Sequence, residues 1–97
     1  MKRLSDERLW ALRNRVPIND VICELDMPAK EVEGYFRFLC PACHDSHTAT
    51  NAETNLARCF RCRKNYNPID LVMTVRRMSF LDAVRYLTKN FGRNLSD

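Results

Sequence analysis

The chain has 97 residues, of which 45% are hydrophobic and 29% are charged, with only two glycines and four prolines. This length suits one small domain and excludes most enzymes that need separate substrate and cofactor domains, while the composition argues against disorder or a fibrous repeat. No stretch approaches the roughly 18 apolar residues of a membrane span, and the first residues lead into no signal-peptide core. We therefore expect a single cytoplasmic unit over residues 1–97 with no membrane partner.

Positive charge is concentrated in the second half of the chain. Residues 56–93 carry nine basic and two acidic side chains, a net charge of +7, whereas residues 1–55 carry a net charge of −2. A strongly basic half indicates an anionic partner, although a solvated surface of lysines and arginines is the commoner explanation of such runs.

The start of the chain predicts a helix. Ser5 is a favourable N-cap residue, and the acidic pair that follows it suits the positive end of a helix dipole. Apolar side chains then recur at helical spacing, at Leu9, Leu12 and Val16. Pro17 ends this helix or starts another, because proline has no N–H group to donate.

Residues 18–25 predict a second, short helix, and residues 26–34 predict a connector around Pro28. Two nearby side chains are expected in the hydrophobic core. Trp10 has no basic cluster that would make it a platform for a nucleic-acid base, and Cys23 behaves as a small apolar residue.

Strands are expected in the middle of the chain. Residues 35–39 are rich in aromatic side chains, residues 48–54 are polar and turn-like with room for a short strand, and residues 56–60 predict a further strand. Since side chains alternate across a strand, two residues should face the core and two should face outward. These are Phe36 and Phe38, and Tyr35 and Arg37, respectively.

The last third predicts two helices. Pro68 suits the first turn of a helix that extends to about Arg77. Ser79 caps a final helix that Gly92 stops, and its apolar side chains repeat every three or four residues. These apolar residues are Phe80, Val84, Leu87 and Phe91.

Four of the five cysteines form two close pairs, in the pattern Cys40-x2-Cys43-x15-Cys59-x2-Cys62. An odd number of cysteines in a chain without signs of secretion argues against a disulfide framework. Two Cys-x-x-Cys turns can place four thiolates around one ion in the tetrahedral arrangement that structural zinc favours. The spacing therefore predicts one structural Zn²⁺ whose binding is coupled to folding. A redox role for the first pair leaves the second pair unexplained.

Two histidines follow the first cysteine pair. His44 and His47 could replace a cysteine as a ligand, because imidazole also binds zinc. Four thiols already suffice, so the simpler interpretation is that the histidines are loop residues that could hydrogen-bond the thiolates.

Five stretches follow one another in a distinctive order: RNRVxIxDVI at residues 13–22, LCP at residues 39–41, CFxC at residues 59–62, IDLVM at residues 69–73 and SFLDAVxxL at residues 79–87. Through them the chain resembles, from about Ser5 to Gly92, the N-terminal zinc-binding domain of bacterial and phage DNA primases. The resemblance implies a zinc ribbon that recognises single-stranded template and presents it for primer initiation.

The sequence departs from that family around the cysteines. Cys43 stands where the family usually has histidine, and residues 46–50 lack the family's Pro-Ser-Phe segment. Residues 63–67, Arg-Lys-Asn-Tyr-Asn, replace a glycine-rich stretch and are more basic and aromatic. These 97 residues hold no polymerase core, which indicates a fragment or a stand-alone relative such as mobile elements carry.

Basic side chains alternate with aromatic rings around the second cysteine pair. Cations hold phosphates and an exposed ring can stack on a base, so this pattern predicts contact with single-stranded DNA. The candidate contact residues are Arg37, Arg58, Arg61, Arg63, Lys64 and Tyr66. Tyr66 is expected to be exposed, whereas burial and exposure are equally expected for Phe60. Arg85 and Lys89 share one face of the last helix and are expected to be solvated.

Three functions can be compared. The first is a nucleic-acid-binding zinc module that acts with a primase polymerase core or a helicase, and the second is a docking module for an acidic replication or transcription protein. Catalysis by this chain alone is disfavoured, because the sequence has no phosphate-binding glycine loop and no recognisable catalytic set, so no catalytic residue is assigned. The expected fold is α+β, a zinc ribbon with a small antiparallel β-sheet flanked by N-terminal and C-terminal helices.

Overall fold

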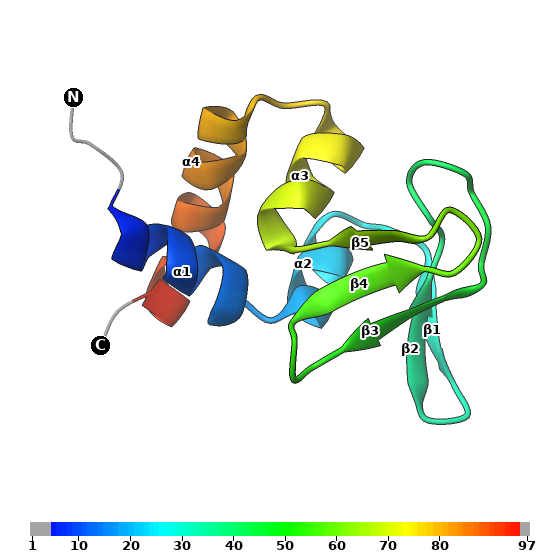
Figure 1. Cartoon of the computed structure of the whole chain (residues 1–97). Helices are drawn as coiled ribbons and strands as arrows, with labels where there is room; N and C mark the ends of the chain where they lie inside the picture. The colour runs from blue at the N-terminus through cyan, green and yellow to red at the C-terminus, as the bar shows by residue number, and fades with distance from the viewer. Residues whose placement is uncertain (1–4, 96–97) are drawn as a thin grey trace.

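The computed structural model describes residues 5–95, with side chains for residues 5–93. In chain order the elements are α1 (Asp6–Asn14), α2 (Ile18–Glu24), β1 (Ala29–Val32), β2 (Tyr35–Phe38), β3 (Thr48–Asn51), β4 (Leu56–Cys59), β5 (Lys64–Tyr66), α3 (Pro68–Arg76), α4 (Phe80–Phe91) and a 3-10 turn (Gly92–Leu95). Figure 1 shows the helices at one end of the molecule and the strands at the other. Four α-helices and two small antiparallel sheets over these residues confirm the predicted α+β fold. No helix within residues 5–95 is long and apolar enough to cross a membrane.

Side chains cap three of the four helices. The Ser5 hydroxyl accepts from the Arg8 N–H at the start of α1, and the Ser79 hydroxyl accepts from the Asp82 N–H at the start of α4. Asn67 and Asp70 form a reciprocal capping box at the start of α3, where each side chain binds the other's backbone N–H. The four predicted helices are confirmed, since α2 also begins at Ile18 directly after Pro17.

The hydrophobic core lies mainly between the helices. Its largest fully buried apolar side chains include Leu12, Val16, Val21, Ile22, Phe38, Ile69, Leu71, Val72 and Leu87. Phe38 is buried and Phe36 packs against the core, whereas Tyr35 is exposed, as the alternation along the strand predicts.

Two predictions about the core are wrong. Trp10 is 55% exposed, because α1 directs Ala11 and Leu12 into the core and leaves the indole outside, where the guanidinium of Arg15 lies 5.5 Å from its ring centroid. Cys23 is exposed, because α2 buries its residues Ile18, Val21 and Ile22 on the opposite face.

The expected connector at residues 26–34 contains a strand. β1 pairs antiparallel with β2 in a register that sets Ala29 opposite Phe38 and Val32 opposite Tyr35. The two-residue turn between them has positive φ at both positions, 52° at Glu33 and 84° at Gly34. Such turns match the right-handed twist of paired strands, which explains how a polar segment becomes half of a hairpin.

The second sheet has the order β3-β4-β5, with β4 in the centre. The short strand expected within residues 48–54 and the strand expected at residues 56–60 are both confirmed. β5 was not expected. It forms because Arg63, at φ 60°, reverses the chain after Cys62, so that Tyr66 pairs with Ala57 on β4.

Two buried polar side chains join the parts of the fold. The Thr48 hydroxyl accepts from the Phe38 N–H at 2.8 Å and donates to the Phe38 carbonyl, which ties β3 to β2. The Asn55 side chain accepts from the Ile18 N–H at 2.9 Å and donates to the carbonyls of Arg13 and Val16 at 2.7 Å each. Asn55 thus fastens the turn between β3 and β4 to the junction of α1 and α2.

Candidate metal centre and nucleic-acid surface

The sulfur atoms of Cys40, Cys43, Cys59 and Cys62 all lie within 4.8 Å of one another. The Cys40 and Cys62 sulfurs are 3.7 Å apart, and the Cys43 and Cys59 sulfurs are 3.6 Å apart. A tetrahedral zinc with Zn–S bonds of about 2.3 Å requires sulfur–sulfur separations of about 3.8 Å, so these thiols fit that ion. The four cysteines form one structural zinc site, as the spacing predicts.

The two Cys-x-x-Cys turns have the same backbone geometry. The His44 N–H donates to the Cys40 carbonyl at 2.9 Å, and the Arg63 N–H donates to the Cys59 carbonyl at 2.8 Å. Both of these donor residues have left-handed backbones, with φ of 62° and 60°. One turn follows β2 and the other joins β4 to β5, so the two sheets hold the turns face to face.

Neither histidine belongs to the cysteine cluster that the described residues form. The ring of His47 packs against Phe60 with 5.3 Å between centroids, and its backbone N–H donates to Asp45 at 2.6 Å. The ligand set is therefore composed of cysteines, and His47 contributes to the surface beside it.

Two thiols of the cluster, those of Cys40 and Cys62, have shifted pKa values. Burial raises the pKa of Cys40, but the backbone N–H groups of Cys43 and Ala42 and the Tyr66 hydroxyl outweigh it and lower the value to about 6. Hydrogen bonding with Cys43, then burial and the other thiols, raises the pKa of Cys62 to about 12. The raised pKa means that the thiolate form of Cys62 is disfavoured at neutral pH beside the neighbouring sulfur atoms. A divalent cation supplies the charge that makes four thiolates compatible.

The predicted exposure of Tyr66 is wrong. Its side chain is only 5% exposed and its hydroxyl oxygen lies 3.8 Å from the Cys40 sulfur. The register explains this, because Tyr66 pairs with the buried Ala57 and shares its inward face of the sheet. Tyr66 therefore cannot stack on a nucleic-acid base in this structure.

Phe60 carries an exposed aromatic ring beside the metal site. It lies between two zinc ligands, is 44% exposed, and has the Arg58 guanidinium 5.7 Å from its ring centroid. Arg58 also donates to the Asn65 side chain at 3.1 Å across the sheet. The sequence did contain a signal for this exposure, namely the position of Phe60 inside the CFxC turn. The cysteines on either side of the turn must face the ion, which leaves the Phe60 side chain to point away from it.

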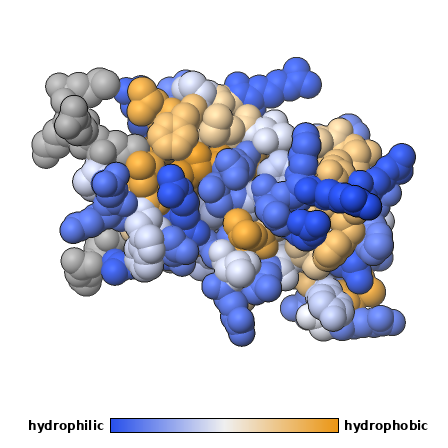
Figure 2. Space-filling view, viewed as in Figure 1, coloured by the Kyte–Doolittle hydropathy of each residue, from blue (hydrophilic) through white to orange (hydrophobic). Residues whose placement is uncertain are grey.

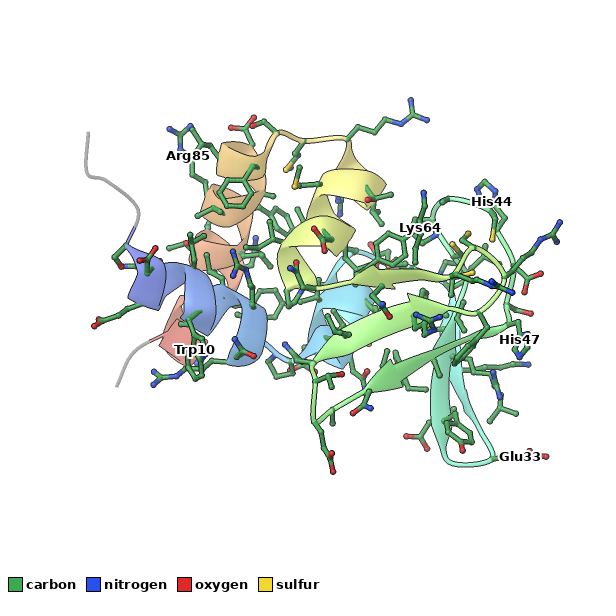
Figure 3. The ribbon with its side chains drawn as sticks, in the orientation of Figure 1. Trp10, Glu33, His44, His47, Lys64 and Arg85 are labelled. Carbon is green, nitrogen blue, oxygen red and sulfur yellow. The ribbon has the colours of Figure 1, made fainter. Side chains whose placement is uncertain are left out.

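The remaining candidate residues lie around the same end of the molecule. Arg61 forms an ion pair of 3.4 Å with Asp45, and this contact, after the His47 N–H, lowers the pKa of that carboxyl group. Arg63 and Lys64 are exposed. We call the end of the molecule that carries the strands and the four cysteines the ribbon end, and the end that carries α1 and α4 the helical end. In Figure 3, Lys64 and both histidines lie at the ribbon end, while Trp10 and Arg85 lie at the helical end.

Arg37 occupies the neighbouring hairpin. Its guanidinium donates to the Thr48 carbonyl at 3.0 Å and lies 5.5 Å from the ring centroid of Tyr35, which is 55% exposed. Five of the six predicted contact residues are thus at least partly accessible, and Tyr66 is not.

Comparisons with known proteins agree with this geometry. Residues 4–97 match the family model described as CHC2 zinc finger. A DNA primase of Streptomyces coelicolor is 29% identical over 96 residues, and one of Geobacillus stearothermophilus is 30% identical over 97 residues. These alignments cover 96% and 97% of this chain but only 15% and 16% of the relatives' own lengths. The chain belongs to the CHC2 zinc-finger family of DNA primases.

Proposed function

We propose that this chain is a zinc-dependent module that binds single-stranded DNA and recognises template for primer synthesis. The observation that carries the proposal is the exposed ring of Phe60, held between two zinc ligands with the Arg58 guanidinium close to its face. An exposed ring beside a cation suits a single strand, because every base has a face that can stack and every nucleotide has a phosphate.

Zinc makes this contact surface rigid. Because Cys59 and Cys62 flank Phe60 and Arg61, the ion fixes the backbone that carries both the stacking ring and one phosphate-binding cation. A preorganised surface loses less conformational entropy when it binds a flexible strand.

Four basic residues lie within four positions of Phe60 in the sequence and form what we call the basic tip: Arg58, Arg61, Arg63 and Lys64. On the adjoining hairpin, Tyr35 and Arg37 repeat the combination of an exposed ring and a nearby guanidinium. Because both combinations lie at the same end of the molecule, we propose that a strand of several nucleotides binds across the ribbon and contacts both.

The matched relatives carry the name DNA primase, and the chain spans about 15% of their length. In our proposal the zinc module holds template, and a separate polymerase core performs nucleotidyl transfer. A helicase is a second candidate partner at the replication fork.

The test is fluorescence anisotropy of a labelled single strand of mixed sequence, titrated with zinc-loaded protein at several salt concentrations. The double variant Arg61→Ala/Arg63→Ala should weaken binding and reduce the slope of log affinity against log salt by about 1.4, since each phosphate contact contributes about 0.7 for single strands. Phe60→Ala should cost about 1–3 kcal/mol of binding free energy, the range of one stacked base.

The matched control is Arg85→Ala/Lys89→Ala, which removes the same charge from the helical end and also includes one ion-paired arginine, Arg85 with Asp82. Equal losses in the two double variants would show a non-specific charge effect. An unchanged affinity and slope in the Arg61→Ala/Arg63→Ala variant would show that the basic tip is not the binding surface.

Docking onto a protein is the second candidate function. Phe80 and Leu81 are exposed at the start of α4, close in sequence to Arg77 and Arg85. Figure 2 shows an apolar area over the region where Figure 1 draws α4. An acidic partner with apolar side chains would suit this surface, and absence of single-strand binding at tens of micromolar protein and low salt would favour it.

A further inference from the structure

Tyr66 is buried beside the metal ligands instead of lying on the DNA surface. Its hydroxyl oxygen lies 3.8 Å from the Cys40 sulfur, and its ring belongs to the hydrophobic core. A zinc-bound thiolate has no proton, so at this contact the tyrosine hydroxyl must be the donor and the sulfur the acceptor.

The negative charge of the zinc site explains why a hydrogen-bond donor at this position would stabilise it. Four thiolates around one Zn²⁺ carry a formal net charge of −2, one unit more than three thiolates and a neutral imidazole would carry. Cys40 and Cys59 are completely buried, so water cannot solvate their sulfurs. Donors from the protein must do so, and the Cys62 N–H reaches the Cys59 sulfur at 3.4 Å.

The position of the hydroxyl is fixed from both sides. Tyr66 pairs with Ala57 on the central strand β4, and the next residue, Asn67, is the N-cap of α3. The ring therefore has little freedom to move away from the metal site. The contact also connects the first cysteine turn to the start of α3, although the two are far apart in the sequence.

We propose that Tyr66 is a positioning residue whose hydroxyl donates a hydrogen bond to the Cys40 thiolate and thereby slows the release of zinc. This role concerns retention of the metal and goes beyond the proposed function, because it holds whether the exposed surface binds DNA or protein.

The test is Tyr66→Phe, which removes the hydroxyl and keeps the ring. Loss of a partner that hydrogen-bonds a metal ligand lowers metal affinity by about 10–100-fold. We take the lower end of that range and expect zinc release to a chromophoric chelator to become about 10-fold faster. In the Co²⁺-substituted protein, the sulfur-to-cobalt charge-transfer band should move to lower energy, because a thiolate without its donor gives up an electron more readily.

Tyr86→Phe is the matched control, since Tyr86 is a half-buried tyrosine on α4 that lies outside the metal site. It should leave zinc release and the cobalt spectrum unchanged. If Tyr66→Phe also leaves both unchanged, the hydroxyl does not act on the ligand. A lower melting temperature with an unchanged cobalt spectrum would equally overturn the proposal, because the hydroxyl would then contribute only to packing.

Discussion

The helical end and the ribbon end of the molecule are stabilised in different ways. The helices bury large side chains against one another, among them Leu12, Ile22, Ile69, Leu71 and Leu87. The strands have only three or four residues each and contribute few large apolar side chains to the core. A two-stranded hairpin is marginally stable by itself, and the three-stranded sheet has few large apolar side chains to bury, so we expect both to depend on the metal and on single buried polar contacts.

This difference shows why the candidate contact surface lies on the ribbon. A zinc ion fixes a short turn without requiring apolar side chains, which leaves Phe60 and the basic tip free to face solvent. The helical end also exposes aromatic and apolar side chains, at Trp10, Phe80 and Leu81. The difference is that Phe60 lies between two metal ligands, so the ion rather than apolar packing fixes the backbone that carries it.

Removal of zinc should have the largest effect on stability, and it should affect the ribbon end much more than the helical end. Structural zinc binding contributes about 10–16 kcal/mol and is coupled to folding. With a strong chelator, amide hydrogen exchange in β3, β4 and β5 should accelerate by orders of magnitude, while α3 and α4 should retain more protection. Far-ultraviolet circular dichroism should show that part of the helical signal remains.

Cys23→Ser serves as the control for chelation, because Cys23 is exposed and lies outside the cluster. This variant should bind and lose zinc as the unaltered protein does. If the strands keep their protection after zinc loss has been verified by metal analysis, the ribbon does not depend on the ion.

Loss of the hydrogen bonds that Asn55 makes between the two ends should have the next largest effect on the free energy of unfolding. Asn55→Ala leaves the Ile18 N–H and the carbonyls of Arg13 and Val16 without their partner. Unpaired buried polar groups cost about 1–3 kcal/mol each, and partial access of water reduces the sum, so we expect a loss of about 3 kcal/mol in the free energy of unfolding. Urea denaturation measures it, and separate transitions for helices and ribbon would sharpen the comparison.

Asn65→Ala is the matched control, since Asn65 is exposed on β5 and its side chain accepts a hydrogen bond from the half-buried Arg58. It should change stability by less than about 0.5 kcal/mol. Equal losses in the two variants would mean that Asn55 does not link the ends.

Local signals explain what the sequence could predict. Helix α4 follows from Ser79 and from apolar residues at helical spacing, and the metal ligands follow from two Cys-x-x-Cys pairs. In each case the interacting residues are close in sequence or belong to one repeated pattern. Local spacing then fixes the geometry.

Pairings between distant residues could not be predicted in this way. β1 depends on a turn in which Glu33 adopts a positive φ, an uncommon conformation for a residue other than glycine. Asn55 acts on residues 37 to 42 positions away, and Tyr66 is buried because a three-residue strand pairs it with Ala57. Tertiary packing decides these features, and the sequence around each residue gives no sign of it.

Trp10→Ala should have the smallest effect, although tryptophan is the largest side chain. Its indole is 55% exposed, and its contact with Arg15 is of a kind worth about 0.5–1 kcal/mol at exposed sites. Alanine recovers part of that loss through its higher helix propensity, so the unfolding free energy should change by about 0.5 kcal/mol or less. Leu12→Ala, two positions along the same helix and fully buried, should cost about 2–5 kcal/mol. Circular dichroism in urea compares the two variants. A Trp10→Ala loss as large as that of Leu12→Ala would place the indole in the core, where the sequence first suggested it.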